Sequence, residues 1–476
     1  MERPAPYSPR PMDPVLLGIA AYVAAQFAIG MWVSRRVSTE DDYFVAGRRL
    51  GMGLGTASIF ATWFGAETCV GAAGAIYAEG LSRTSVEPFA YGICLLLLGL
   101  VFAAPFWRTK VVTIADFLRT RYSRGVERFA ALLLIPTSVF WAAAQISAFG
   151  TVLSEASELS PILGLTVAAA LVIAYTTAGG MMSDVLTDFI QAIALTVGLL
   201  VLFLGVVGEL GGFGELAHAV GSARIELLAA EGPGVLDTLE AWALPICGSV
   251  VAQEVVSRSL SARTESIARR SALAGGALYI AVGSIAVVLG LVGPRLVPDI
   301  EHPERLLTVL AESQLGTLGF VLFSGAIVSA ILSTVDSTLL VASSLLSRNL
   351  LVHSDDAPQK RRVLTARLCV AGFGVIAWLL ALGSSSVMES IENASGFGSA
   401  GILVVACFGL FTRFGGARAA VAALAAGIVV WILGRWVIDG WPQPYLCSLA
   451  AAFLAYTGSA MLDRATNAPR IGEKIT

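Results

Sequence analysis

Thirteen stretches of mainly apolar residues dominate this chain and leave little room for any other kind of structure. Crossing a bilayer as a helix takes about 20 such residues. Charged residues make up 14% of the chain, whereas a soluble domain carries about 25%. The sequence therefore predicts an all-α polytopic membrane protein embedded in a lipid bilayer. The expected spans are 14–34, 51–80, 85–107, 127–153, 160–179, 185–208, 238–257, 271–294, 315–347, 364–384, 390–412, 417–437 and 443–462.

The positive charges are distributed unevenly over the connecting loops. If the N-terminus lies outside, 24 of the 31 Lys and Arg residues fall on the cytoplasmic side. Cytoplasmic loops of membrane proteins carry such an excess. The asymmetry predicts a multi-pass protein of a bacterial cytoplasmic (inner) membrane, with its N-terminus outside and its C-terminus inside.

Several classes of protein are disfavoured by what the sequence lacks. The six Cys residues lie in apolar segments without a CxxC spacing, and the three His residues lie in loops, so neither a disulfide framework nor a transition-metal centre is predicted. No GxxxxGK[ST] phosphate-binding loop occurs. With no nucleophile–base pair and a net charge of −3, we expect neither an enzyme nor a nucleic-acid-binding protein. The chain reads as a single membrane domain, and either a monomer or a homodimer is compatible with it.

Two predicted spans contain helix-breaking residues near their middle. The second span is rich in glycine and carries Glu67, and the seventh contains Pro245 and Gly248. Paired interrupted helices in corresponding positions point to an inverted-repeat transporter with its binding site at the midplane. The alternative is a pair of kinked packing helices.

The ninth span carries a polar stripe. Ala330, Ser333, Thr334 and Ser337 fall at i, i+3, i+4 and i+7, on one face of a helix. That face offers small hydroxyl ligands suited to a dehydrated alkali cation, although a packing seam of small residues has the same pattern. Asp336 favours the functional interpretation, because a carboxylate at membrane depth costs about 2.5–3.5 kcal/mol on insertion scales.

Three longer motifs carry a resemblance to a known family. They are DYFVAGRRLG at 42–51, TAGGMMSDVLTDFIQ at 177–191 and SAILSTVDSTLLVASSLLSRN at 329–349. Together they resemble the sodium/solute symporter family, which includes sodium/proline, sodium/glucose and high-affinity choline transporters. The likeness runs from about residue 14 to 440. Its choline branch is matched locally by ATWFGAE at 61–67, EPFAY at 87–91 and FWAAAQISAFG at 140–150.

The resemblance implies a LeuT-like core of two inverted five-helix repeats within 13 transmembrane helices. The repeats would occupy 51–208 and 238–412. An extra N-terminal helix region (14–50), two C-terminal helices (417–462) and a cytoplasmic tail (463–476) would complete the chain.

The family's sodium site can be transferred to this chain position by position. The resemblance implies that sodium is bound by the carbonyls of Ala61, Phe64 and Ala330 and by the hydroxyls of Ser333 and Thr334. The last three coincide with the polar stripe found from periodicity. No metal other than sodium is expected.

Two acidic residues lie at or just before the start of the sixth span, within the motif at 177–191. Asp188 matches an acidic residue near the cytoplasmic sodium exit path. Alternatively, it is an interface carboxylate that pairs with a nearby Arg. Asp184 is expected to be a plain interface residue.

Three aromatic residues indicate the class of solute that the protein could bind. Trp63, Tyr91 and Trp141 match the choline pocket, where ring faces hold a quaternary ammonium by cation–π attraction. Ala252 replaces a third tryptophan and Glu67 replaces a glycine, which favours a different amine-bearing solute. Glu67 could instead pair with Arg258 or a backbone donor. The complete predicted solute-binding set is Trp63, Glu67, Tyr91, Trp141 and Gln253. Arg258 itself is expected to pair with Glu254 within one helix.

Taken together, the sequence predicts a sodium-coupled secondary symporter. It would import a small polar organic solute by alternating access, with amine-bearing or quaternary ammonium compounds favoured. Alternatives within transport are an amino acid, sugar or carboxylate as solute, and proton coupling through Glu67. A sensor with a transporter-like body and a passive channel are the rivals from other classes.

Overall fold

The computed structural model describes residues 14–35, 37, 39–65, 67–155, 160–221, 225, 234–351, 358–383 and 387–467. Regular structure in these residues is helical, apart from two isolated β-bridges. The α-helices are α1 (Pro14–Ser34), α2 (Glu40–Val45), α3 (Met52–Trp63), α4 (Ala73–Glu79), α5 (Phe89–Leu97), α6 (Ala103–Thr109), α7 (Ile114–Arg121), α8 (Arg124–Glu155), α9 (Pro161–Gly179), α10 (Met181–Leu210), α11 (Phe213–Gly221), α12 (Val235–Ser249), α13 (Gln253–Ser261), α14 (Glu265–Leu296), α15 (Leu306–Ser344), α16 (Gln359–Gly383), α17 (Val387–Gly396), α18 (Ser399–Phe411), α19 (Ala417–Ile432) and α20 (Pro444–Asn467).

The helices confirm a polytopic membrane protein. Among the described residues, nine helices are long and apolar enough to cross a bilayer, or ten if one bent pair counts as a span. The sequence-based count of thirteen therefore stays a prediction. Helices are present at each of the thirteen positions, but the second and the seventh are broken into shorter pieces.

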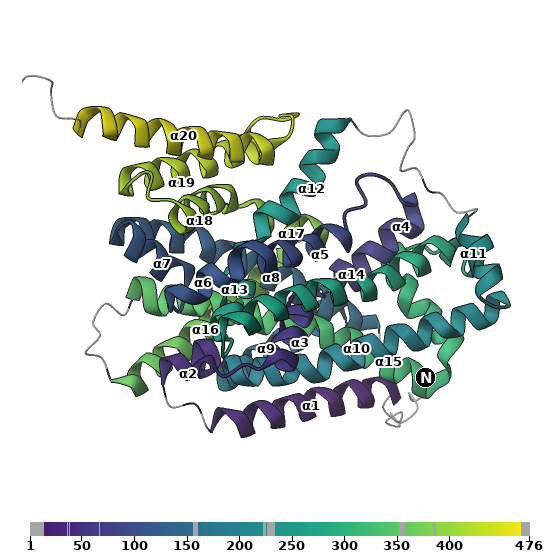
Figure 1. Cartoon of the computed structure of the whole chain (residues 1–476). Coiled ribbons are helices and arrows are strands. Elements are labelled where there is room, and N and C mark those ends of the chain that lie inside the picture. The colour runs from purple at the N-terminus through teal and green to yellow at the C-terminus, as the bar shows by residue number, and fades with distance from the viewer. Residues whose placement is uncertain are drawn as a thin grey trace, which may run out of the picture.

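Packing places three helices from distant parts of the chain together. α10 packs along α15, and α3 packs against α10, α14 and α15. In Figure 1, α1 lies along one side of the bundle, whereas α18, α19 and α20 are stacked on the opposite side. α1 packs against α10 and α15, so these two helices lie between α1 and the rest of the bundle (Figure 1).

Both predicted interruptions are present. α3 ends at Trp63, and Phe64 has a non-helical backbone (φ −88°, ψ 70°). The chain resumes as a π-helical segment, η2 (Glu67–Ala72), before α4. In the seventh predicted span, α12 and α13 are bent by 43° at a short break.

Gly248 explains why α12 can approach α17 at this break. A Cβ atom at this position would lie 2.5 Å from the backbone oxygen of Ser395. Only glycine avoids this overlap, so the close contact between α12 and α17 requires a glycine at position 248.

Candidate functional site

A buried carboxylate joins the three packed helices. Asp188 on α10 accepts a hydrogen bond from the Ser58 hydroxyl on α3 at 2.5 Å. It also accepts one from the Ser333 hydroxyl on α15. All three side chains are fully buried. The predicted exit-path residue and the predicted sodium ligand Ser333 are therefore in direct contact.

The hydroxyls of α15 do not all point the same way. Thr334 bonds back to the carbonyl of Ala330 at 3.4 Å, and Ser337 bonds back to that of Ser333 at 2.8 Å. Ser333 instead donates across the helix boundary to Asp188. A hydroxyl has one hydrogen and two lone pairs, so Ser333 can donate to the carboxylate and still offer oxygen lone pairs to a cation.

The broken helix supplies the remaining predicted ligands. α3 ends immediately after Ala61 and Thr62, at Trp63. Carbonyls in the last turn of a helix have no intrahelical donor. Ala61 and Phe64 are both buried, and Ala61 lies one turn beyond Ser58, which reaches α15 through Asp188. The geometry thus brings the α3 end toward the hydroxyls of α15.

An arginine completes this polar core. Arg258, on α13, is fully buried. Its Nη2 atom lies 2.5 Å from Asp184 and 3.7 Å from Asp188, and its Nε atom donates to Ser58 at 3.3 Å. It also donates to the Ser337 hydroxyl. We name the set Ser58, Asp184, Asp188, Arg258, Ser333 and Ser337 the ionic core.

Two expectations about charged residues are corrected here. Asp184 is not a plain interface residue, because it is buried and paired with Arg258. Arg258 contacts the backbone oxygen of Glu254 at 3.1 Å rather than its carboxylate. The Glu254 carboxylate accepts a hydrogen bond from Ser138 at 2.6 Å. The carboxylates of α10 therefore compensate the buried charge of Arg258, while Glu254 supplies only a backbone contact.

The three predicted aromatic residues lie together. The ring centroids of Trp63 and Tyr91 are 5.1 Å apart, those of Trp63 and Trp141 5.6 Å, and those of Tyr91 and Trp141 6.0 Å. These are the spacings of rings in mutual contact. The cluster is thus closed in this conformation, and a cation would have to separate the rings to lie between them.

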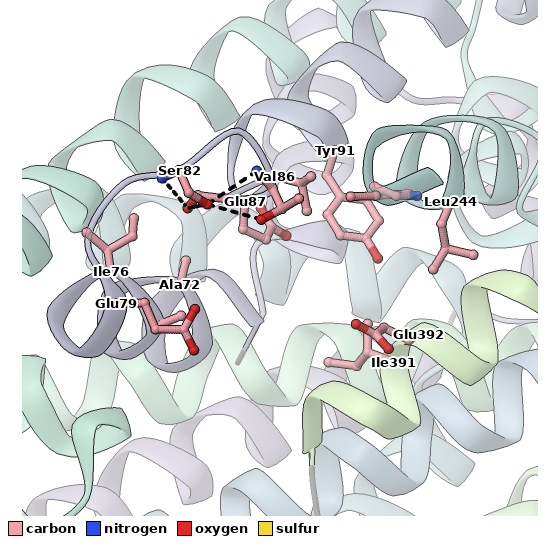
Figure 2. A pocket seen from close by; sticks show the side chains of 15 residues that line it. Ala72, Ile76, Glu79, Ser82, Val86, Glu87, Tyr91, Leu244, Ile391 and Glu392 are labelled. Atoms are coloured by element: carbon pink, nitrogen blue, oxygen red, sulfur yellow. Dashed lines mark hydrogen bonds between the residues drawn. The ribbon is translucent and has the colours of Figure 1, made fainter. Parts of the chain in front are cut away.

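A cavity of about 330 Å³ opens beside this cluster. Tyr91 lines it, and Figure 2 shows the Tyr91 hydroxyl directed toward Ile391 and Glu392 of α17. Glu79 and Glu87 also line the cavity, and its described lining contains no Lys or Arg. Its other lining residues are Ala72, Ala75, Ile76, Ser82, Thr84, Ser85, Val86, Ala241, Leu244 and Pro245.

Of the two remaining predicted solute ligands, the structure describes the side chain of Gln253. The Gln253 side chain accepts from the backbone of Ile114 at 2.6 Å and donates to that of Val112 at 3.3 Å. It therefore holds the start of α7. The side chain of Glu67 lies outside the described residues.

Sequence reasoning missed Ser58, and it did not identify Thr176 as the polar group that pairs with Asp336. Ser58 precedes Ala61 by three residues on one face of α3, a spacing that could have identified it. Asp336 accepts a hydrogen bond from Thr176 at 2.5 Å. Its other oxygen is buried without a hydrogen-bond partner among the described residues. No pattern in the sequence links Asp336 to Thr176.

These features define a class of protein, a helical membrane transporter with two broken helices and a buried ionic core. The chain's fold resembles the solved substrate-bound outward-open Na⁺-coupled sialic acid symporter, with a TM-score of 0.79, 20% identity, and coverage of 94% of this chain and 97% of that one.

The family is shown by sequence. The model of the sodium:solute symporter family matches residues 43–427, and the chain belongs to that family. High-affinity choline transporter 1 of Drosophila melanogaster is 26% identical over 398 residues, which is 78% of this chain and 62% of the relative. The sodium/pantothenate symporter of Escherichia coli is 25% identical over 435 residues, covering 88% of this chain and 89% of the relative. Relatives named for such different solutes do not fix the solute of this chain.

Proposed function

We propose that this protein is a sodium-driven secondary symporter that imports a small cationic or amine-bearing solute by alternating access. Membership of the sodium:solute symporter family supports sodium-coupled solute transport. The observation that carries the proposal is the bridge from Ser58 through Asp188 to Ser333, because it joins a broken helix to the predicted sodium ligands.

The proposed sodium site combines two kinds of oxygen. The carbonyls of Ala61, Phe64 and Ala330 and the hydroxyls of Ser333 and Thr334 are its ligands. Asp188 lies directly behind Ser333 and contributes negative charge without needing to touch the ion. Sodium bound here ties α3 to α15. A ligand shifts a conformational equilibrium only when it binds one state better, and an ion held between two helices meets that condition.

The proposed solute site is the aromatic cluster together with the cavity beside it. Glu79, Glu87 and Glu392 give the cavity an acidic lining, although Glu392 lies 3.9 Å from Arg435. An acidic wall next to aromatic faces favours a cation, since cation–π contacts contribute about 0.5–2 kcal/mol each. The closed packing of Trp63, Tyr91 and Trp141 implies that these rings rearrange when the solute binds.

Uptake into proteoliposomes under an imposed sodium gradient tests the proposal. A panel of labelled amino acids, betaines, polyamines, sugars and carboxylates should reveal one cationic or amine-bearing class that accumulates only with sodium outside. Accumulation that needs a proton gradient and ignores sodium would contradict sodium coupling. Accumulation of sugars or carboxylates alone would contradict the proposed solute class.

A further inference from the structure

The buried arginine of the ionic core lies on a different helix from its side-chain partners. Arg258 belongs to α13, the second half of the bent pair, whereas both carboxylates lie on α10. Ser58 lies on α3 and Ser337 on α15. The guanidinium therefore links four helices at one buried point through hydrogen bonds and ion pairs.

The charges of the core do not cancel. Within it, two carboxylates face a single guanidinium, and all three side chains are buried. Breaking a buried pair is strongly unfavourable, because it leaves a charge without compensation. One of the two carboxylates therefore has no guanidinium of its own, and the proposed sodium site beside Ser333 can supply a second cation.

The distances show which carboxylate the guanidinium neutralises in this conformation. Nη2 lies 2.5 Å from Asp184 and 3.7 Å from Asp188. The two carboxylates are four residues apart on one helix face, so a small movement of the same nitrogen exchanges its partner. Ser58 already joins both groups, since it donates to Asp188 and accepts from Arg258.

We infer that Arg258 is a tethered counter-cation that competes with sodium for Asp188. With sodium beside Ser333, the guanidinium remains on Asp184. After sodium leaves, the guanidinium moves onto Asp188 and compensates its charge. The transporter without bound sodium can then return to its starting conformation with no uncompensated carboxylate in its core. This inference rests on the proposed sodium site, but it makes a separate claim about Arg258.

The proposed competition predicts an increase in sodium affinity when Arg258 is removed, a result that damage to the fold does not produce. Removing the guanidinium together with Asp184 leaves Asp188 as the only charge in the core. Sodium then has no rival, so the double variant Asp184→Asn/Arg258→Gln should bind sodium more tightly. A purely structural role for Arg258 predicts weaker or unchanged binding.

The experiment measures binding of radiolabelled sodium alone to purified, reconstituted protein. We expect the sodium dissociation constant of the double variant to fall by at least about tenfold, which corresponds to about 1.4 kcal/mol. Arg258→Gln alone leaves two bare carboxylates and is likewise expected to bind sodium more tightly if it folds. Arg108→Gln is the matched control, since Arg108 forms an exposed ion pair with Glu265 at 2.6 Å, and its sodium binding should equal wild type.

A second background isolates the role of Asp188. In Asp188→Asn protein, adding the Asp184→Asn/Arg258→Gln pair should no longer tighten sodium binding, because the contested carboxylate is gone. Equal or weaker sodium binding by the double variant in the wild-type background overturns the inference. Absence of sodium binding by wild-type protein would instead overturn the proposed sodium site, so the two failures are distinguishable.

Discussion

Ser333→Ala is the most direct perturbation of the proposed sodium site. The change removes a predicted sodium ligand and also the hydrogen bond that Ser333 donates to the buried Asp188 carboxylate. A hydrogen bond to a charged group contributes about 1.5–3 kcal/mol. If that loss falls on the sodium-bound state, the sodium concentration for half-maximal binding rises by about 10- to 150-fold.

The control for this variant lies on the same helix. Ser343 is also fully buried on α15, but its hydroxyl donates to the backbone of Ala366 at 2.6 Å, away from Asp188. Ser343→Ala removes an equivalent buried hydroxyl and should leave sodium affinity unchanged. Radiolabelled sodium binding to both purified variants gives the comparison. Wild-type sodium affinity in Ser333→Ala would refute the reasoning, as would equal weakening in Ser343→Ala.

Three further predictions concern the solute side and the bent pair. Tyr91→Phe removes the hydroxyl that contacts Ser395 (3.1 Å) and keeps the ring. It should change solute half-saturation less than Tyr91→Ala, which opens the aromatic cluster, and a concentration series of uptake compares them. Glu87→Gln removes a charge from the cavity wall and should weaken competition by cationic solutes more than by uncharged ones in the same uptake assay. Gly248→Ala pushes a methyl group against the Ser395 backbone and should cost about 1–3 kcal/mol, seen as a lower melting temperature in detergent.

The sequence predicted the spans and the polar stripe because the bilayer enforces both. Lipid leaves a span few ways to satisfy its backbone, so apolar length alone reports a helix. Ser333 and Thr334 stood out because they share one helix face and lie beside Asp336, a carboxylate that is costly at that depth. The glycine and proline signals also located both breaks, at Phe64 and between α12 and α13.

The partners inside the core could not be predicted in the same way. Glu254 was the obvious partner for Arg258 because it lies one turn away, yet the actual partner Asp184 is 74 residues distant in sequence. Local spacing says which residues share a helix face, but not which helix that face meets. Gln253 illustrates the same limit, since its amide holds the backbone at the start of α7, 139 residues away.

The ionic core also suggests why one carboxylate can couple an ion to a conformational change. Asp188 receives Ser333 from α15, Ser58 from the broken helix α3 and Arg258 from the bent pair. A carboxylate has only two oxygens, and because Asp188 is fully buried its partners are not readily replaced by solvent. When the charge beside Ser333 changes, the compensating movement therefore falls to Ser58 or Arg258. Each of these residues lies on a helix that is interrupted nearby. At the proposed sodium site, coupling would follow from charge compensation across the two helix breaks, without a separate relay.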